Sequence, residues 1–559
     1  MSRQTARTID YQIMWNRLIA VVEEQATTLV RTAFSTSVRE AGDLSAGLFD
    51  ARARMIAQAV TGTPGHVNAM AESVAHFARI IGTDTMAEGD VYITNDPWMG
   101  TGHLHDITVV TPVFRVGRHV GYFACTAHVV DVGGRGFGPD ANEVYEEGLL
   151  IPITRFADRG RVVDLLVDFV RANVRTPDQT VGDIHSLAAC NEAGNRRLQA
   201  MLDEFGLSHI EDLADFILEA SGRATRQAIA GVADGAYANA MQVDGYDEPV
   251  TMRVRLDVKG ESLTADFAGT SGPSRFGVNV PEVYTRAYAC YALKCAIAPD
   301  VPNNAGSLAP FAITAPEGCI LAARRPAPVS VRHVIGHLVP DVVLGALHQA
   351  MPDTVPAEGS SALWNIQIAT SPVDPDAGLP SHQVLKFNSG GTGARPALDG
   401  LDATAFPSGV STMSVEATEQ VGAITVWRKE FREGSGGAGR FRGGVGQVIE
   451  IEARGPYEFA FNAMFDRVAN PARGREGGLA GAPGRVELAD GTPLRAKGRQ
   501  RVPQGARLRL SLPGGGGYGD PATRDPHVLR QDLASGLVTP EQAKRDYAIA
   551  DPHEGEDAD

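Results

Sequence analysis

The chain has 559 residues, with 51 Lys and Arg against 67 Asp and Glu, and a formal charge of -16 at pH 7. Such a charge repels phosphate backbones and anionic lipid surfaces, which argues against nucleic acid and membrane as partners. The length exceeds a single hydrophobic core, and 43% hydrophobic with 21% charged residues is typical of a globular protein with several lobes.

The five cysteines show no CxxC spacing, which argues against a disulfide framework and a four-thiolate zinc site. No stretch is apolar enough for a signal peptide or a membrane span, so we expect a cytoplasmic protein. The acidic end, 551–559, offers almost nothing to pack and is expected to be a frayed tail.

The first 240 residues alternate between helix and strand patterns. Asp10 is expected to cap a helix that runs to residue 32, and GDLSAGLFD and ARARMIAQAV read as two strands joined at 51–54. A helix over 67–81, strands over 91–94 and 107–130, and helices over 187–205 and 210–232 follow.

The remaining chain is richer in strands. Alternation begins near residue 246, where Gly260 and Glu261 predict a hairpin turn, and the last third contains the glycine-rich GSGGAGRFRGGVGQ and LPGGGGYGDP. Two small helices are expected over 526–547, the second capped by Thr539. The fold class is therefore α+β, a multi-lobed mixed chain. The expected lobes are 1–240 with a metal site, a strand-led lobe over 241–420, a glycine-rich β lobe over 421–525, and small helices with the tail over 526–559.

The segment 93–134 concentrates four histidines and three aspartates among strands. Gly117 and Arg118 suit a two-residue turn, which would place Ile107 opposite His128. His128 then returns to the HLHD segment, where a curled loop could bring His103, Asp106 and His128 around one cation.

A purely structural explanation also fits these residues, since they could form a hydrogen-bonded loop and strand end in which Asp106 accepts from main-chain amides. Pro112 lies inside the first strand and removes an amide donor, which predicts an edge position or a bulge.

NDPWMGTGHLHDITVVTPVF resembles the signature of the hydantoinase B and oxoprolinase family. Further matching stretches follow in the family's order: GDLSAGLFD, AHVVDVGG, RANVRTPDQTVGDIHSLAACNEAGNRRL, VPNNAGSLAPFAITAPEG, GSGGAGRFRGGVGQ and LPGGGGYGDPATRDP. The resemblance therefore covers nearly the whole chain.

The resemblance implies a subunit that works in a hetero-oligomer with an ATP-binding hydantoinase A type subunit on a small cyclic amide. Two histidines and two aspartates hold zinc or manganese in members with a defined metal centre. The matching positions here are Asp43, His103, Asp106 and His128. Zinc is the first expectation, and the ligand types also suit manganese or iron.

The chain departs from the family at His105, where many relatives have a small residue or proline, and in the glycine–threonine order around Thr101 and Gly102. His105 is thus a candidate substitute or supporting ligand. Asn95 and Asp96 could bind substrate or orient His103, although NDP is also an ordinary turn.

Outside that segment, SVRHVIGH spaces His333 and His337 four apart without the Glu of HExxH, so a packed helix start is the simpler explanation. Arg332 beside them could bind a substrate carboxylate or phosphate. The glycine-rich tracts contain no P-loop and predict tight turns and close subunit packing. Cys290 and Cys295 are expected in the core.

We therefore expect an ATP-dependent hydrolase in which the partner phosphorylates the ring amide and this chain delivers metal-activated water, with Asp106 or Asp131 accepting the proton. Asp131 could equally be a turn residue at the end of a strand. The alternatives are a metal-binding subunit of an ATP-dependent ketone carboxylase and a non-catalytic scaffold for the ATPase subunit.

Overall fold

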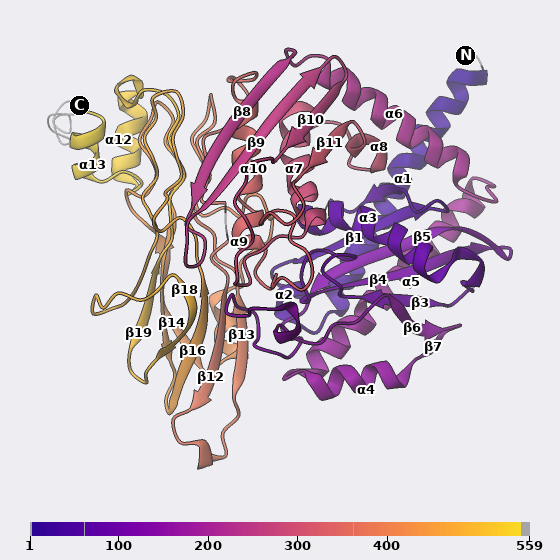
Figure 1. The fold of residues 1–559 in the computed structure, drawn as a ribbon, viewed down its shortest axis with the longest axis horizontal. Coiled ribbons are helices and arrows are strands. Elements are labelled where there is room, and N and C mark those ends of the chain that lie inside the picture. The colour runs from indigo at the N-terminus through magenta and orange to yellow at the C-terminus, as the bar shows by residue number, and fades with distance from the viewer. Residues whose placement is uncertain (1–2, 61, 362, 549–559) are drawn as a thin grey trace.

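The computed structural model describes residues 3–60, 62–361 and 363–548, so the expected acidic tail lies outside the described residues. Figure 1 shows a mixed αβ part, coloured indigo to magenta, beside a strand-rich part in orange and yellow. The predicted α+β class is confirmed.

A seven-stranded antiparallel sheet organises the first part, in the order β2-β1-β5-β4-β3-β6-β7. Its strands are β1 (Leu44–Asp50), β2 (Met55–Gln58), β3 (Val91–Thr94), β4 (Asp106–Arg115), β5 (Arg118–His128), β6 (Thr154–Asp158) and β7 (Arg161–Val162). The strands predicted in GDLSAGLFD, in ARARMIAQAV and over 91–94 are confirmed.

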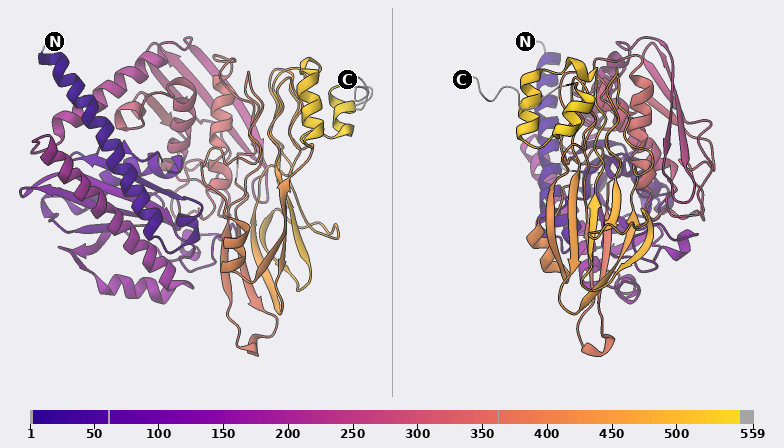
Figure 2. Two further views of the ribbon diagram at one scale, coloured as in Figure 1. Left: turned by 180° about the vertical axis from the view of Figure 1, so that it is seen from behind. Right: turned by 90° about the vertical axis from the view of Figure 1, so that its left-hand side faces the viewer.

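Helices bury both faces of this sheet, which explains why β4 lacks hydrophobic–polar alternation. Side chains such as Val109 and Cys125 face α1 (Arg3–Thr32) and α5 (Pro177–Glu204), which Figure 2 shows lying across one side. Val110 and Ala124 face α3 (Pro64–Ile81) on the other side.

The other helices of this part are α2 (Thr36–Arg39), α4 (Asp164–Asn173) and α6 (Glu211–Ile229). Asp10 was expected as a helix cap, but it lies inside α1, because the polar residues before it contain no Gly or Pro that would end the helix.

A second layer carries the sheet β11-β10-β9-β8, with β8 (Gly235–Val243), β9 (Val250–Lys259), β10 (Ser262–Asp266) and β11 (Phe311–Thr314). Ser262 pairs with Lys259 across Gly260 and Glu261, which confirms the predicted hairpin. The layer's helices are α7 (Glu282–Ile297), α8 (Ala305–Leu308), α9 (His333–Gly336) and α10 (Val339–Leu347). Packing of α7 on both α3 and α10 joins this layer to the first part.

The strand-rich part is a sandwich of two four-stranded sheets over one hydrophobic core. One sheet has β12 (Ile366–Pro372), β13 (His382–Lys386), β16 (Tyr457–Met464) and β18 (Lys497–Val502). The other has β14 (Ile424–Phe431), β15 (Gln447–Ala453), β17 (Arg485–Leu488) and β19 (Arg507–Ser511), with α11 (Val415–Val421) beside β13 and β14. The lobe boundaries remain predictions, although the first of these sheets joins strands from both sides of residue 420.

The glycine-rich tracts pack against one another within the chain. Main-chain hydrogen bonds of 2.9 Å run from Gly444 to Thr392 and from Gly515 to Gly444. A Cβ at Gly391 or Gly443 would overlap a neighbouring carbonyl, so these positions admit no side chain.

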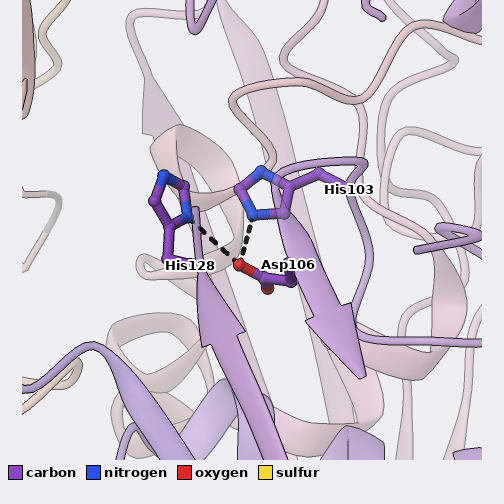
Figure 3. Close-up of side chains that lie close together, drawn as sticks. All are labelled: His103, Asp106 and His128. Atoms are coloured by element: carbon purple, nitrogen blue, oxygen red, sulfur yellow. Dashed lines mark hydrogen bonds and ion pairs between the residues drawn. The ribbon is translucent and has the colours of Figure 1, made fainter. Parts of the chain in front are cut away.

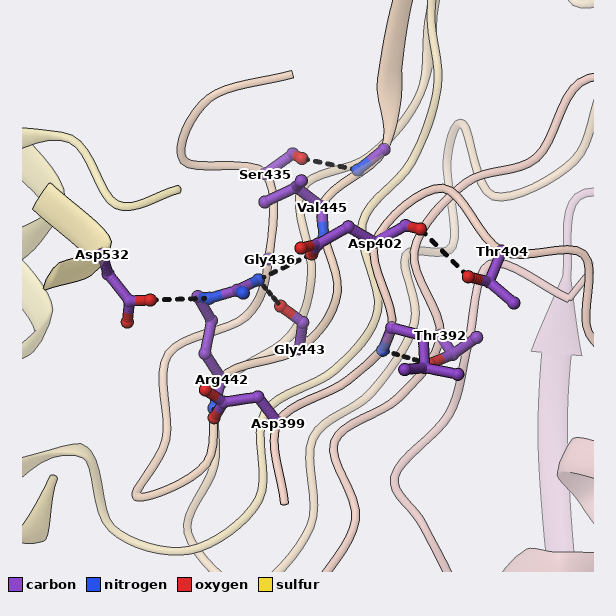
Figure 4. A network of polar contacts seen from close by, with 12 residues as sticks. Thr392, Asp399, Asp402, Thr404, Ser435, Gly436, Arg442, Gly443, Val445 and Asp532 are labelled. Carbon is purple, nitrogen blue, oxygen red and sulfur yellow. Dashed lines mark hydrogen bonds and ion pairs between the residues drawn. The ribbon is translucent and has the colours of Figure 1, made fainter. Parts of the chain in front are cut away.

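Buried charges attach the C-terminal helices to these loops, as Figure 4 shows. Arg442 donates to Asp402 at 3.0 Å and to the Gly443 carbonyl at 2.7 Å, and it faces Asp532 of α12 (Pro526–Ala534). The side chain of Thr539 accepts from the Gln542 amide and caps α13 (Pro540–Asp546), as predicted.

Short 3-10 turns complete the elements at Thr83–Thr85, Val144–Glu146, Pro375–Ala377 and Pro521–Thr523. No helix within the described ranges combines the length and hydropathy needed to cross a membrane. All five cysteines are free thiols, and Cys290 is buried as expected, whereas Cys295 is exposed.

Candidate metal centre

Two of the expected metal-binding side chains, Asp106 and His128, meet because the start of β4 and the end of β5 lie at the same end of the seven-stranded sheet, and Asp43 lies beside them just before β1. Asp106 begins β4 and lies directly opposite His128, the last residue of β5. Leu44 of β1 pairs with Ala127, so Asp43 lies next to His128 and accepts a hydrogen bond from its main-chain amide at 3.1 Å.

The predicted register of this hairpin was wrong by one residue, since Ile107 was expected opposite His128. The turn uses Val116 and Gly117, both with positive φ, so Arg115 pairs with Arg118. This turn displaces the pairing by two residues from the prediction, and a bulge between Val113 and Phe114 moves it back by one. The two displacements bring Asp106 rather than Ile107 opposite His128.

His103 completes a triad from the loop before β4, which curls as expected (Figure 3). Its Nε2 lies 2.7 Å from Asp106 Oδ1, and Nδ1 of His128 lies 3.1 Å from the same oxygen. One nitrogen or oxygen from each residue lies within 4.8 Å of the others, and all three side chains are buried. This arrangement could hold a metal ion.

The second oxygen of Asp106 is surrounded by three further groups. It accepts from the Thr101 hydroxyl at 2.7 Å and from Arg332 at 2.5 Å, and it pairs with His66 Nε2 at 2.9 Å. Burial alone would raise the pKa of Asp106, but the neighbouring His66 and Arg332 hold it well below its usual value. Asp106 is therefore a carboxylate.

The protonation of His103 provides a test of whether a cation fits. Its Nδ1 lies 2.7 Å from the Ser330 carbonyl, which can only accept, so Nδ1 carries the proton. Burial, with Arg332 nearby, lowers the pKa of His103 to about 3, so the ring is neutral. Its Nε2 lone pair then faces the charged Asp106 oxygen, and a divalent cation bound by both atoms would replace their repulsion by two favourable bonds. The residues fit a metal.

Asp43 lies at the rim of the triad. Its Oδ2 is 4.0 Å from His128 Nδ1, and its Oδ1 accepts from the Thr63 hydroxyl at 3.1 Å. Asp43 Oδ1 also lies 3.6 Å from Nε2 of His66. His66 was not among the residues that the sequence predicted at the site. Burial lowers the pKa of His66, but the charges of Asp106 and Asp43 outweigh burial and raise this pKa above its usual value. The sequence feature that could have identified His66 is Thr63-Pro64, because this pair predicts a helix start with His66 in its first turn.

His105, the departure from the family pattern, is fully buried beside the triad. Its ring stacks on His128, with centroids 5.5 Å apart, and neither ring nitrogen has a partner among the described residues. Burial and the neighbouring His128 hold the pKa of His105 well below its usual value. It supports the His128 ring in this structure.

A lid of aromatic and imidazole side chains covers the triad. Phe137 packs on His128 and on His333, while Tyr284 contacts His337 Nε2 at 3.0 Å. The space enclosed by these side chains is about 20 Å³, which is room for roughly one water molecule. The ring nitrogens His333 Nε2 and His337 Nδ1 have no hydrogen-bond partner within the described residues.

Arg332, a candidate to bind a substrate anion or to support the metal ligands, contacts Asp106 of the triad in this structure. Its Nε donates to the Thr101 carbonyl at 2.7 Å and its guanidinium lies 4.0 Å over the Tyr284 ring. Gly102 permits this approach, because a Cβ there would lie 2.6 Å from the Arg332 side chain. A substrate anion would have to displace Asp106 from the guanidinium.

The remaining expected site residues have structural partners. Asn95 bonds the carbonyls of Leu104 and Leu149 and thereby holds the loop that carries His103. Asp96 pairs with Arg325 at 2.7 Å. Asp131 pairs with Arg175 at 2.7 Å and accepts from two main-chain amides, so both of its oxygens are engaged.

Comparisons with known proteins agree along most of the chain. The family model described as Hydantoinase B/oxoprolinase matches residues 7–521. One of the subunits of a putative D-/L-hydantoinase from Pseudomonas sp. is 27% identical, over 97% of this chain and 95% of that protein.

Two solved structures share the fold. The ATP-dependent caprolactamase from Pseudomonas jessenii has a TM-score of 0.86 at 24% identity, covering 97% of this chain and 96% of that one. Nucleotide-free acetone carboxylase has a TM-score of 0.87 at 18% identity, covering 97% of this chain and 79% of that one.

Proposed function

Because the chain belongs to the hydantoinase B/oxoprolinase family, we propose that it is the metal-binding subunit of an ATP-dependent cyclic amidase. The proposed ligands are Asp43, His103, Asp106 and His128, with zinc first and manganese or iron as alternatives. The partner is an A-type subunit that binds ATP, and the cytoplasm remains the expected compartment.

The observation that carries this proposal is the meeting of His103 Nε2, Asp106 and His128 Nδ1 in a buried, enclosed space. A divalent cation held there would polarise a carbonyl and lower the pKa of water from about 15.7 toward 7. The protein's part is to fix the donors: Ser330 holds the His103 tautomer, and Arg332 keeps Asp106 charged.

Proton transfer needs an acceptor group. Asp106 and Asp131 remain the proposed acceptors. Asp106 is held by five neighbours and Asp131 by Arg175, so proton uptake by either carboxylate would weaken one of these contacts.

A partner is required because an unstrained ring amide is a poor electrophile. Phosphorylation of the amide oxygen by the ATP-binding subunit would activate it before water attacks. The hydantoinase relative is named as one subunit of its enzyme, which supports such a division of labour.

A ketone carboxylase subunit is the second candidate, because acetone carboxylase shares the fold. The chain covers 79% of that carboxylase chain against 96% of the caprolactamase chain, which favours hydrolysis by length. A non-catalytic scaffold for the ATPase is the third possibility, and absence of stoichiometric metal would favour it.

Purification with and without the A-type subunit tests the proposal. We expect one transition metal per chain in both preparations, and ATP-dependent ring opening only in the complex, assayed with lactams, hydantoins and 5-oxoproline. Ring opening by the isolated chain would refute the division of labour. ATP turnover that requires bicarbonate and a ketone would identify a carboxylase.

A further inference from the structure

A small cleft lies between the loop at 133–137 and the strand-rich part, at the boundary between the two parts in Figure 1. Its volume is about 70 Å³, which is roughly the space of a few water molecules or of one phosphate ion. We call it the arginine cleft, because Arg135, Arg175 and Arg499 line it and none of its described lining residues is acidic. In a chain with a formal charge of -16, such a wall is a local reversal of sign.

The floor of the arginine cleft is the outer face of the sheet β13-β12-β16-β18. Its lining residues pair across the strands in two rows, which are Gln383, Ala369 and Ala460 in one row and Gln367, Asn462 and Arg499 in the next. They alternate along the strands with core residues such as Ile368 and Phe461, so their side chains point away from the sandwich core. The two small alanines leave a hollow that carboxamides and one guanidinium surround.

Two of the arginines are held in place by the mixed part. Arg135 pairs through Nε with Glu146 at 2.5 Å, so both of its terminal nitrogens are free to donate. Arg175 pairs with Asp131 at 2.7 Å and donates to the Gly133 carbonyl at 3.2 Å. The two side chains are 56% and 45% exposed, so both guanidinium groups remain accessible from the cleft.

Arg499 supplies a charge that the chain does not neutralise. Its guanidinium has no hydrogen bond or ion pair with any residue that the structure describes. Asp140 accepts from the main-chain amide of Arg499 at 2.8 Å and from the Tyr246 hydroxyl at 2.5 Å, and it leaves the guanidinium without a partner. A third cation beside two others is favourable when an anion lies among them.

Two buried carboxamides add oriented N–H donors. Gln367 is 4% exposed and accepts from the Phe137 amide at 2.5 Å, and Asn462 is 9% exposed and donates to the Phe137 carbonyl at 2.9 Å. Each carboxamide nitrogen has two hydrogens but only one acceptor among the described residues, so a second N–H remains for a ligand. Three guanidinium groups and two carboxamides thus converge on one small space.

The arginine cleft and the metal pocket lie at opposite ends of Phe137. The main chain of Phe137 is held by the floor of the cleft, whereas its ring packs on His128 and lines the metal pocket. A ligand in the cleft would therefore touch the loop that carries Phe137 without touching the metal ligands.

We infer that the arginine cleft binds a phosphate-sized oxyanion, held by Arg135, Arg175 and Arg499. A tetrahedral phosphate suits the cleft better than a carboxylate, because it offers an acceptor oxygen to each of the three guanidinium groups. The anion would bridge the loop at 133–137 and β18, and so fix the loop that carries Phe137. This site goes beyond the proposed function and would exist whether or not the chain opens a ring.

Calorimetric titration of the full chain with inorganic phosphate tests the site. Metal is first removed with a chelator, so that phosphate has no cation to bind at the triad, and the ionic strength is kept low because salt screens exposed arginines. We expect saturable binding of one phosphate per chain. Arg499→Gln and Arg135→Gln should each raise the dissociation constant about tenfold or more, since each removes a charged donor.

Arg485→Gln is the matched control. Arg485 is an exposed arginine that begins β17 in the other sheet of the sandwich, so its loss should leave the dissociation constant unchanged. Absence of saturable binding, or equal dissociation constants for Arg499→Gln and Arg485→Gln, would overturn the inference.

Methyl phosphate and acetate distinguish the possible anions. Methyl phosphate that binds as tightly as phosphate would assign the cleft to a phosphoryl group on a larger molecule, and binding about tenfold weaker would assign it to free phosphate. Either result supports the site. Acetate should bind at least about tenfold more weakly than phosphate, and equal affinity would overturn the choice of phosphate.

Trypsin cleavage after Arg135, identified by mass spectrometry, reports on the loop itself. Phosphate at about ten times its dissociation constant should slow this cleavage about tenfold, because most chains then hold the anion. Arg499→Gln at the same phosphate concentration should lose most of this protection, whereas Arg485→Gln should keep it. An unchanged cleavage rate in the phosphate-bound chain would refute the bridge between the loop and β18.

Discussion

His103 donates its Nδ1 proton to the carbonyl oxygen of Ser330, 227 positions later in the chain, at 2.7 Å. This bond makes Nε2 the free nitrogen of the ring and aims it at Asp106. The metal site is thus completed by a segment far from the HLHD motif, and its tautomer is set by the main chain.

Loss of either triad imidazole should remove the metal. We expect His103→Ala and His128→Ala to reduce bound metal from about one equivalent to nearly none by elemental analysis, because each removes one of few donors. His119→Ala is the matched control, since His119 lies in the same hairpin but pairs with Phe114 near the far turn. Full metal content in both triad variants would remove the proposed site.

Gly102→Ala should disturb the contact between Arg332 and the HLHD loop. The new Cβ would lie 2.6 Å from Arg332, so we expect a loss of about 1–3 kcal/mol in urea unfolding and weaker metal binding. Gly117→Ala is the control, since Gly117 also has a positive φ of 74° but nothing within 4 Å of its Cβ. Equal losses in the two variants would show that backbone strain alone matters.

Glu147 should make stability depend on pH. Burial raises its pKa from 4.5 to about 8, although the amides of Val329 and Ser330 both donate to it. Because the pKa of Glu147 is higher in the folded than in the unfolded chain, the protonated carboxyl stabilises the fold fully below about pH 4.5. This stabilisation is lost as the pH rises toward 8, by roughly 1.4 kcal/mol for each unit by which the folded pKa exceeds the unfolded one.

The Glu147→Gln variant keeps the acceptor and removes the titration. Its unfolding free energy, measured with chelator present, should therefore fall less between about pH 6 and about pH 9 than that of the unchanged chain. Parallel pH profiles would contradict the assignment.

Arg467 should be essential for joining the sandwich to α10. Its side chain is 1% exposed and pairs with Asp341 at 2.7 Å and with Glu358 at 3.2 Å. Arg467→Met leaves two buried carboxylates without this partner, and we expect a loss of about 3–5 kcal/mol by chemical denaturation. Arg501→Met, which removes an exposed pair with Glu458, should cost about 0–1 kcal/mol.

Local patterns predicted much of the fold. The strands around Gly47 and Ile93, the hairpin at Gly260 and the cap at Thr539 follow from short-range rules, and the structure confirms them. The hairpin register was wrong because Val116 adopts a left-handed conformation that its residue type disfavours.

The composition of the candidate site was harder to predict than its motif. His66 and Arg332 reach Asp106 from positions 40 residues before it and 226 after it, and no spacing rule links segments so far apart. Arg332 also looked like a substrate-binding residue, because sequence cannot show that Asp106 already occupies its guanidinium.

The interlocked glycine tracts also constrain how the protein is made. Thr392, Gly444 and Gly515 bond one another although they are dispersed over more than a hundred positions, so this layer stays unformed until the ribosome has delivered the last tract. A nascent or truncated chain that stops before residue 513 would leave the earlier tracts without their main-chain partners. Such a product should depend on chaperones and be readily degraded.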